Sequence, residues 1–187
     1  MSAVNASTVS DAIKHDHAEL KECYENILRT QDTDSKMRWQ NQFTWELARH
    51  SLGEELVVYP AMERHLGQAS KEMANKDRKE HLKVKELLYK FQKLSPSDRG
   101  FEPPIRSLWS ELNQHIQEEE SHDLPALEKT LAEGDSKSMV SSFGRMKMFV
   151  PTRSHPSSPD KPPFETVAGL MAAPMDKLKD LFRRFPE

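Results

Sequence analysis

The sequence has little of three features that place proteins in membranes, outside the cell or on nucleic acid. Its single cysteine, Cys23, cannot form a disulfide within the chain, and its first residues, MSAVNASTVSDAIK, lack the apolar core of a signal peptide. No run of residues approaches the ~20 apolar positions that a transmembrane helix requires. Lysine and arginine number 27 against 30 acidic residues, so no positive excess points to nucleic acid. We therefore expect an intracellular, cytoplasmic protein with no transmembrane segment and no nucleic acid partner.

What the sequence does have is helical periodicity. In four stretches, residues repeat three and four positions apart along what would be one helix face, and short breaks separate the stretches. Short connections favour antiparallel neighbours, so the pattern predicts an all-α protein, an up-down-up-down four-helix bundle over residues 10–133. The expected inward-facing positions, stretch by stretch, are Ile13, His17, Leu20, Tyr24, Ile27; Phe43, Leu47, His50, Glu54, Val57; Ala74, Asp77, His81, Val84, Leu88, Phe91; and Ile105, Leu108, Leu112, His115, Glu119, His122, Ala126.

The rest of the chain, residues 134–187, differs in composition. Residues 134–163 are rich in Ser, Pro and Lys, which predicts a linker with little core of its own. Residues 174–185, PMDKLKDLFRRF, have apolar positions at helical spacing and predict a short amphipathic helix. This helix either docks back onto the bundle or binds a membrane surface or a protein partner. The apolar positions are Met175, Leu178, Leu181, Phe182 and Phe185.

The bundle sequence contains an internal repeat. HSLGEELVVYPAMER at 50–64 aligns without gaps on HIQEEESHDLPALEK at 115–129, and HAELKECY at 17–24 aligns on HLKVKELL at 81–88. The two offsets, 65 and 64 residues, are nearly equal. The chain therefore resembles a helical hairpin repeated once, and two hairpins packed about a pseudo-twofold axis would bring four histidines together.

Histidine and glutamate occupy the expected inner faces. His50 and Glu54, like His115 and Glu119, are four residues apart, so imidazole and carboxylate can project from one helix face towards one metal centre. Carboxylates from facing helices can also bridge two metals. Nitrogen and oxygen ligands without a thiolate suit iron or manganese, and zinc less well. The predicted metal ligands are His17, His50, Glu54, His81, His115 and Glu119.

The other histidines and acidic residues near these positions have different expected roles. His122 lies one turn beyond Glu119 and either binds the metal or caps the end of the site by hydrogen-bonding a ligand carboxylate. Asp77, four residues before His81, is costly to bury unpaired, and either a metal or a basic side chain would satisfy it. The residues expected at the surface are His15, His65 and His155, and those expected in solvent or hydrogen-bonded to ligands are Glu55 and Glu120.

These motifs together resemble a known family. KHDH at 14–17, HSLGEE at 50–55, EHLKVKELL at 80–88 and HIQEEE at 115–120, with Pro-Ala-x-Glu after each H-x3-E-E, are similar to the hemerythrin-like HHE cation-binding domains over residues 10–133. The resemblance implies a bundle with two non-haem irons per chain, manganese being less expected. It also implies that oxygen or another diatomic gas binds at an open position. The implied ligands are His17 and His50 on one iron, His81 and His115 on the other, and Glu54 and Glu119 as bridges.

The sequence departs from the oxygen-carrying members in two places. Those members have H-x3-H on the third helix, where this chain has Asp77 and His81, and an aspartate five residues after the fourth-helix histidine, where this chain has Glu120. Replacing an imidazole by a carboxylate, or by no ligand, should favour the oxidised metal. The centre is therefore expected to react with oxygen more readily than to release it.

Two functions fit these residues. The first is a metal-binding module that binds, stores or senses iron and diatomic gases and has no substrate of its own; it needs only the ligand set. The second is an enzyme of oxidase or peroxidase type, which would also need a channel and further acid-base groups. The sequence offers few such groups, so the first function is the expectation. A metal-free scaffold would leave six buried polar side chains without partners.

Overall fold

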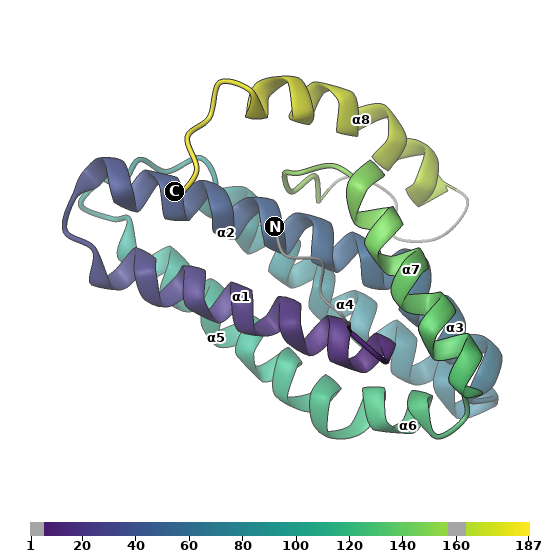
Figure 1. The fold of residues 1–187 in the computed structure, drawn as a ribbon. Helices are drawn as coiled ribbons and strands as arrows, with labels where there is room; N and C mark the ends of the chain where they lie inside the picture. Colours follow the sequence, from purple (N-terminus) through teal and green to yellow (C-terminus); the bar gives the residue numbers. More distant parts are fainter. Residues whose placement is uncertain (1–5, 157–163) are drawn as a thin grey trace.

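The chain folds as a bundle of four long helices with two further helices on its outside (Figure 1). The computed structural model describes residues 6–156 and 164–187, which include no strand. The bundle consists of α1 (Val9–Arg29), α2 (Thr33–Gly53), α4 (Gln68–Phe91) and α5 (Glu102–Glu118), and consecutive helices run in opposite directions. None of the described helices is long and apolar enough to cross a membrane. The predicted all-α bundle is confirmed.

Local signals begin and end the bundle helices. Thr8 and Asp11 form a capping box at the start of α1, and the Asp32 side chain accepts a hydrogen bond from the Ser35 amide at the start of α2. Gly67, with a φ of 73°, provides the left-handed turn before α4. Inside the bundle, apolar side chains form one cluster around Leu20 and Phe43 and a second around Ile13 and Val58. The candidate ligands lie between these clusters along the bundle.

Two bundle helices contain a π turn at equivalent positions. α2 continues through η1 (Glu54–Val58) into α3 (Tyr59–His65), and α5 continues through η2 (Glu119–Asp123) into α6 (Leu124–Glu128). A π turn holds one extra residue, so each helix face shifts by one position beyond it. The predicted inner position His122 is therefore wrong, since His122 is exposed and its neighbour Asp123 is buried. Val57 is half-buried against the second apolar cluster, and its neighbour Val58 is fully buried.

The linker predicted at 134–163 is wrong over its first half. Helix α7 (Glu133–Phe149) occupies this stretch and packs against α1, α2 and η1. Its Phe143 is buried where α2 has a glycine, and a Cβ atom on Gly53 would lie 2.7 Å from the Phe143 ring. Because this contact joins residues far apart in the sequence, composition alone could not predict it. Residues 157–163 of the predicted linker lie outside the described residues.

Helix α8 (Phe164–Asp180) lies on the outside of the molecule, at the top of Figure 1. It begins ten residues before the predicted start at 174 and ends before the predicted end at 185. Of the five apolar positions predicted at helical spacing, only Phe185 packs against the bundle, with its ring centre 6.3 Å from that of Trp45. The four exposed positions are Met175, Leu178, Leu181 and Phe182.

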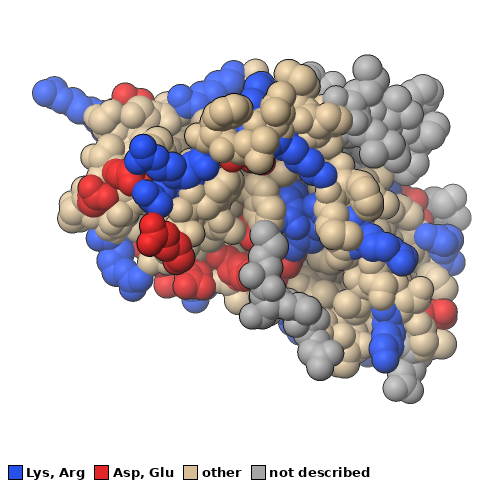
Figure 2. All heavy atoms as spheres, turned by 45° about the horizontal axis from the view of Figure 1, so that its top comes forward, with Lys and Arg blue, Asp and Glu red and all other residues tan. Residues whose placement is uncertain are grey.

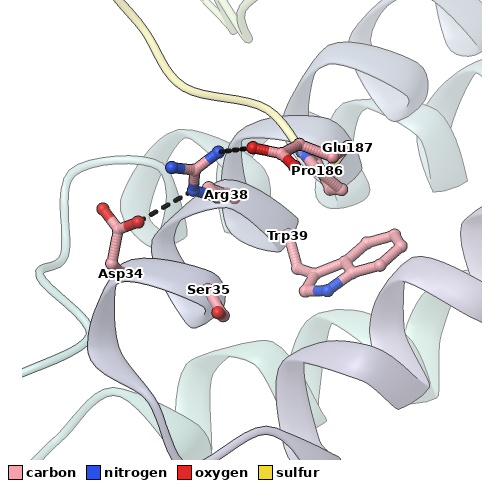
Figure 3. A pocket seen from close by; sticks show the side chains of 6 residues that line it. All are labelled: Asp34, Ser35, Arg38, Trp39, Pro186 and Glu187. Carbon is pink, nitrogen blue, oxygen red and sulfur yellow. Dashed lines mark hydrogen bonds and ion pairs between the residues drawn. The ribbon is translucent and has the colours of Figure 1, made fainter.

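The C-terminal residues lie against the start of α2. The Arg38 guanidinium bonds the Asp34 carboxylate at 2.8 Å and lies 3.8 Å from the Glu187 carboxylate, beside the pocket that Pro186 and Trp39 line (Figure 3). The amide of Asn41 donates to the Arg184 carbonyl at 2.9 Å. These contacts hold the chain beyond α8 against the bundle.

Candidate metal centre

The six predicted ligands converge at one place in the bundle. His17 comes from α1, His50 from α2, His81 from α4 and His115 from α5, while Glu54 and Glu119 are the first residues of the two π turns. None of the six is more than 4% exposed. The six residues predicted from their spacing therefore form a buried cluster of imidazoles and carboxylates.

Glu54 lies between the two pairs of histidines. One of its oxygens is 3.2 Å from His50 Nε2, and the other is 3.4 Å from His81 Nε2. His17, His50 and Glu54 place ligand atoms within 4.8 Å of one another, and so do Glu54, His81 and His115. Glu119 lies 3.4 Å from His17 Nε2. A carboxylate shared by two such groups can bridge two cations.

Each of the four histidines is oriented by a carboxylate behind it. The Nδ1 atoms of His17 and His81 face Glu120 and Glu55, at 2.7 and 3.3 Å. Because a carboxylate only accepts, each Nδ1 carries a proton, and Nε2 is the ring atom through which these two imidazoles can bind a cation. The other two pairs are His50 with Asp16, at 3.2 Å, and His115 with Glu80, at 2.9 Å.

The four carboxylates that face the histidines occupy equivalent positions in the internal repeat. Glu55 corresponds to Glu120, 65 positions on, and Asp16 corresponds to Glu80, 64 positions on. Glu55 and Glu120 were expected either in solvent or hydrogen-bonded to ligands, and the structure places both against the predicted ligands. Asp16 and Glu80 were missed by the sequence argument, although the acidic residue directly before His17 and His81 was a repeated signal.

Lysines neutralise three of these carboxylates. Lys85 bonds Glu55, Lys76 lies 3.2 Å from Glu80, and Lys147 donates to Asp16 at 2.5 Å. Lys76 is one turn before Glu80 on the same helix, but the position one turn before Asp16 is Ala12. Helix α7 supplies the missing cation through Lys147, so α7 completes the surroundings of His50.

Burial and charge set the protonation of the centre. Burial lowers the pKa of His50 to about 4, so this imidazole is neutral, as a metal ligand must be. Burial opposes the charge of His17, but Glu119 and Glu120 outweigh it and raise its pKa to about 9. Burial, with the negative charge of Glu119, raises the pKa of Glu54 well above its usual range. In the absence of a cation, the cluster therefore holds protons in its place.

The centre contains polar atoms that the protein itself does not satisfy. Among the described residues, His17 Nε2, His50 Nε2 and both carboxylate oxygens of Glu54 and Glu119 are buried without a hydrogen-bond partner. Buried polar groups are rarely left in this state, since each costs free energy. Metal ions would satisfy all of them at once, so the residues present fit a metal-loaded site.

The two halves of the centre differ. Tyr59 is buried and donates its hydroxyl to His81 Nε2 at 2.8 Å, whereas the repeat places Leu124 at the equivalent position. Asp77 is buried near His115 with an unpaired carboxylate oxygen, and burial raises its pKa to about 7. The half around His81 and His115 therefore has two additional proton-holding groups. The sequence left open whether a metal or a basic side chain satisfies Asp77. It did not predict the place of Tyr59, because the π turn rotates this residue inwards.

The remaining histidines lie away from the centre. His15 and His65 are exposed. His155 is half-buried, and its ring bonds Asp176 of α8 at 2.8 Å. His122 is exposed and its ring bonds the neighbouring Ser121 hydroxyl, so it does not cap the centre.

Comparison with known proteins identifies the family. The family model of the hemerythrin HHE cation-binding domain matches residues 8–127. The chain belongs to this family. It is 58% identical over 178 residues to a hemerythrin-like protein of Schizosaccharomyces pombe, covering 95% of this chain and 88% of that relative. It is 23% identical over 145 residues to a DNA nickase of Nostoc sp., covering 78% of this chain but 40% of the nickase. No solved structure matches the chain. Family membership and the His/Glu clusters indicate metal binding.

Proposed function

We propose that this chain is a non-haem di-iron protein that binds or senses iron and a diatomic gas such as oxygen. The observation that carries the proposal is the paired ligand set, in which carboxylates fix all four histidines through Nδ1 and the carboxylates of Glu54 and Glu119 lie unpaired between them. His17 and His50 would hold one iron and His81 and His115 the other, with Glu54 and Glu119 as bridges.

Iron fits this donor set. Imidazole and carboxylate without thiolate suit iron or manganese, and the only cysteine, Cys23, lies in the apolar cluster around Leu20. When bound, two irons supply reversible oxidation and an open position for a small ligand. The residues of the chain orient the imidazoles and keep bulk water away, since all six ligands are buried.

Metal content and gas response test this function. The purified chain, reconstituted anaerobically with ferrous iron, should contain about two irons and show a charge-transfer absorption band after oxidation. His50→Ala and Glu119→Ala should lose the band and at least one iron, while the exposed His15→Ala should keep both. Recovery of the original spectrum after the gas is removed indicates binding, and permanent oxidation indicates reaction. A chain without stoichiometric metal after reconstitution would contradict the proposal.

An oxidase or peroxidase activity is the second candidate, favoured by Tyr59 and Asp77. Both side chains hold protons beside His81 and His115, where a reduction of oxygen or peroxide would need them. Tyr59→Phe should then slow peroxide consumption in the presence of a reductant, while iron content and gas binding stay unchanged. Tyr24→Phe, at a half-buried tyrosine stacked on Trp109, is the matched control. Equal rates in both variants would exclude a role for the Tyr59 hydroxyl.

A further inference from the structure

Helix α8 packs on the molecule with its acidic side inwards. Asp176 is buried and accepts a hydrogen bond from His155 at 2.8 Å, and Asp180 accepts one from the Thr152 hydroxyl at 2.6 Å. In the described part of the segment, the four large apolar residues from Met175 to Phe182 face solvent, with Leu181 and Phe182, just beyond α8, 78% and 85% exposed, whereas the small Ala173 is buried. For these described side chains the arrangement is the reverse of an ordinary surface helix, whose large apolar residues face the core. Polar contacts therefore hold the end of α8 in place, and the large apolar side chains from Met175 to Phe182 are left exposed.

The exposed apolar side continues onto the end of α7. Met148 and Phe149 are exposed there, and the Lys177 amine of α8 bonds the Met148 carbonyl and lies 5.8 Å from the Phe149 ring centre. Six of the nine large apolar side chains exposed in the described part of the chain belong to this region. We call this region the α7–α8 face; its residues are Met148, Phe149, Met175, Leu178, Leu181 and Phe182. A grouping of this kind marks an interaction surface, whereas single exposed apolar residues do not.

Positive charge accompanies the α7–α8 face. Lys177 and Lys179 of α8 and Arg145 of α7 are exposed, while Asp176 and Asp180 of α8 bond to protein groups. Figure 2 brings the side of the molecule with α8 forward and shows blue Lys and Arg side chains among uncharged ones along its upper part. The helix therefore presents apolar and basic groups together to the outside.

We propose that the α7–α8 face binds the surface of an anionic lipid membrane. A helix on the outside of a molecule, with an exposed Met, an exposed Leu between lysines, and an exposed Leu and Phe just beyond its end, can lie in the plane of the lipid headgroups. Lysines near the surface then add attraction to anionic lipids. A second copy of the chain is a poorer occupant, because face-to-face packing would bring the same lysines together.

Vesicle binding by the full-length chain tests this proposal. We expect co-sedimentation with vesicles of phosphatidylcholine and phosphatidylserine, and at least about tenfold weaker binding to vesicles of phosphatidylcholine alone. High salt should weaken the binding, because it screens the lysines. Absence of binding to the phosphatidylserine vesicles overturns the proposal, whatever else the chain binds.

Two pairs of variants assign the binding to this face. The double variant Leu181→Ser, Phe182→Ser should lose binding at least about tenfold while keeping its melting temperature, because both side chains are exposed. Leu82→Ser, at an exposed leucine of α4, should bind like the wild type. Lys177→Glu with Lys179→Glu should weaken binding more than the control Lys90→Glu with Lys137→Glu. Unchanged vesicle binding by the Leu181, Phe182 variant would overturn the proposal. So would a wild-type chain that does not bind vesicles but forms a dimer that this variant abolishes.

Discussion

At the scale of single residues, the centre depends on groups that do not touch the metal position. Asp16 accepts from His50 and is itself held by Lys147, and these partners outweigh burial and lower its pKa to about 2. A carboxylate that stays ionised at any ordinary pH keeps the proton on His50 Nδ1 and the lone pair on Nε2. Asp16 is therefore a positioning residue for one half of the centre.

Replacing Asp16 should damage one metal position and spare the other. Asp16→Ala removes the acceptor behind His50, and loss of such an acceptor typically lowers metal affinity by about 10–100-fold. Stepwise anaerobic titration with ferrous iron should show one weakened step and one unchanged step, because His81 and His115 have their own carboxylates. Glu19→Ala, one turn away and exposed, is the control. Equal weakening of both steps would show that Asp16 supports the whole fold.

At the scale of helices, the sequence predicted what local periodicity records. The inner positions from Ile13 to Leu20 and from Phe43 to Glu54 are buried as the three-and-four spacing predicts. The spacing failed beyond Glu54 and Glu119, where each π turn adds a residue without a distinctive local sequence. It also failed for α7, whose packing depends on a distant glycine. Positions fixed by tertiary contacts leave little trace in local composition.

The fit of α7 against α2 depends on the missing side chain of Gly53. Alanine there would gain helix propensity but place its Cβ 2.7 Å from the Phe143 ring, and such overpacking typically costs about 1–3 kcal/mol. We expect Gly53→Ala to lower the free energy of unfolding in urea. Gly144→Ala, on α7 with nothing within 4 Å of the added Cβ, should instead raise it by about 0.5–1 kcal/mol. Changes of the same sign in both variants would show that α7 does not pack on Gly53.

At the scale of the whole molecule, metal binding and stability are linked through Glu54. Its buried carboxyl lies beside Glu119, so the folded chain without metal must either hold a proton there or bear two close negative charges. A cation removes this conflict and adds its binding free energy to folding. The bundle is thus built to be more stable with metal than without it.

The pH dependence of the metal-free protein tests this link. Because the pKa of Glu54 is raised in the folded state above the ordinary value of 4.5, the folded chain binds this proton more tightly than the unfolded chain does. The contribution of Glu54 to the free energy of unfolding should therefore fall as the pH rises above 4.5, by up to about 1.4 kcal/mol per pH unit, until the folded-state pKa is passed. Glu54→Gln has no such proton to lose. In urea titrations with a chelator present, the stability of the variant relative to the wild type should therefore increase as the pH rises above 4.5. With ferrous iron the wild type should be the more stable of the two, since only the wild type retains the bridging carboxylate. Parallel pH curves for the two proteins would mean that Glu54 is satisfied without metal.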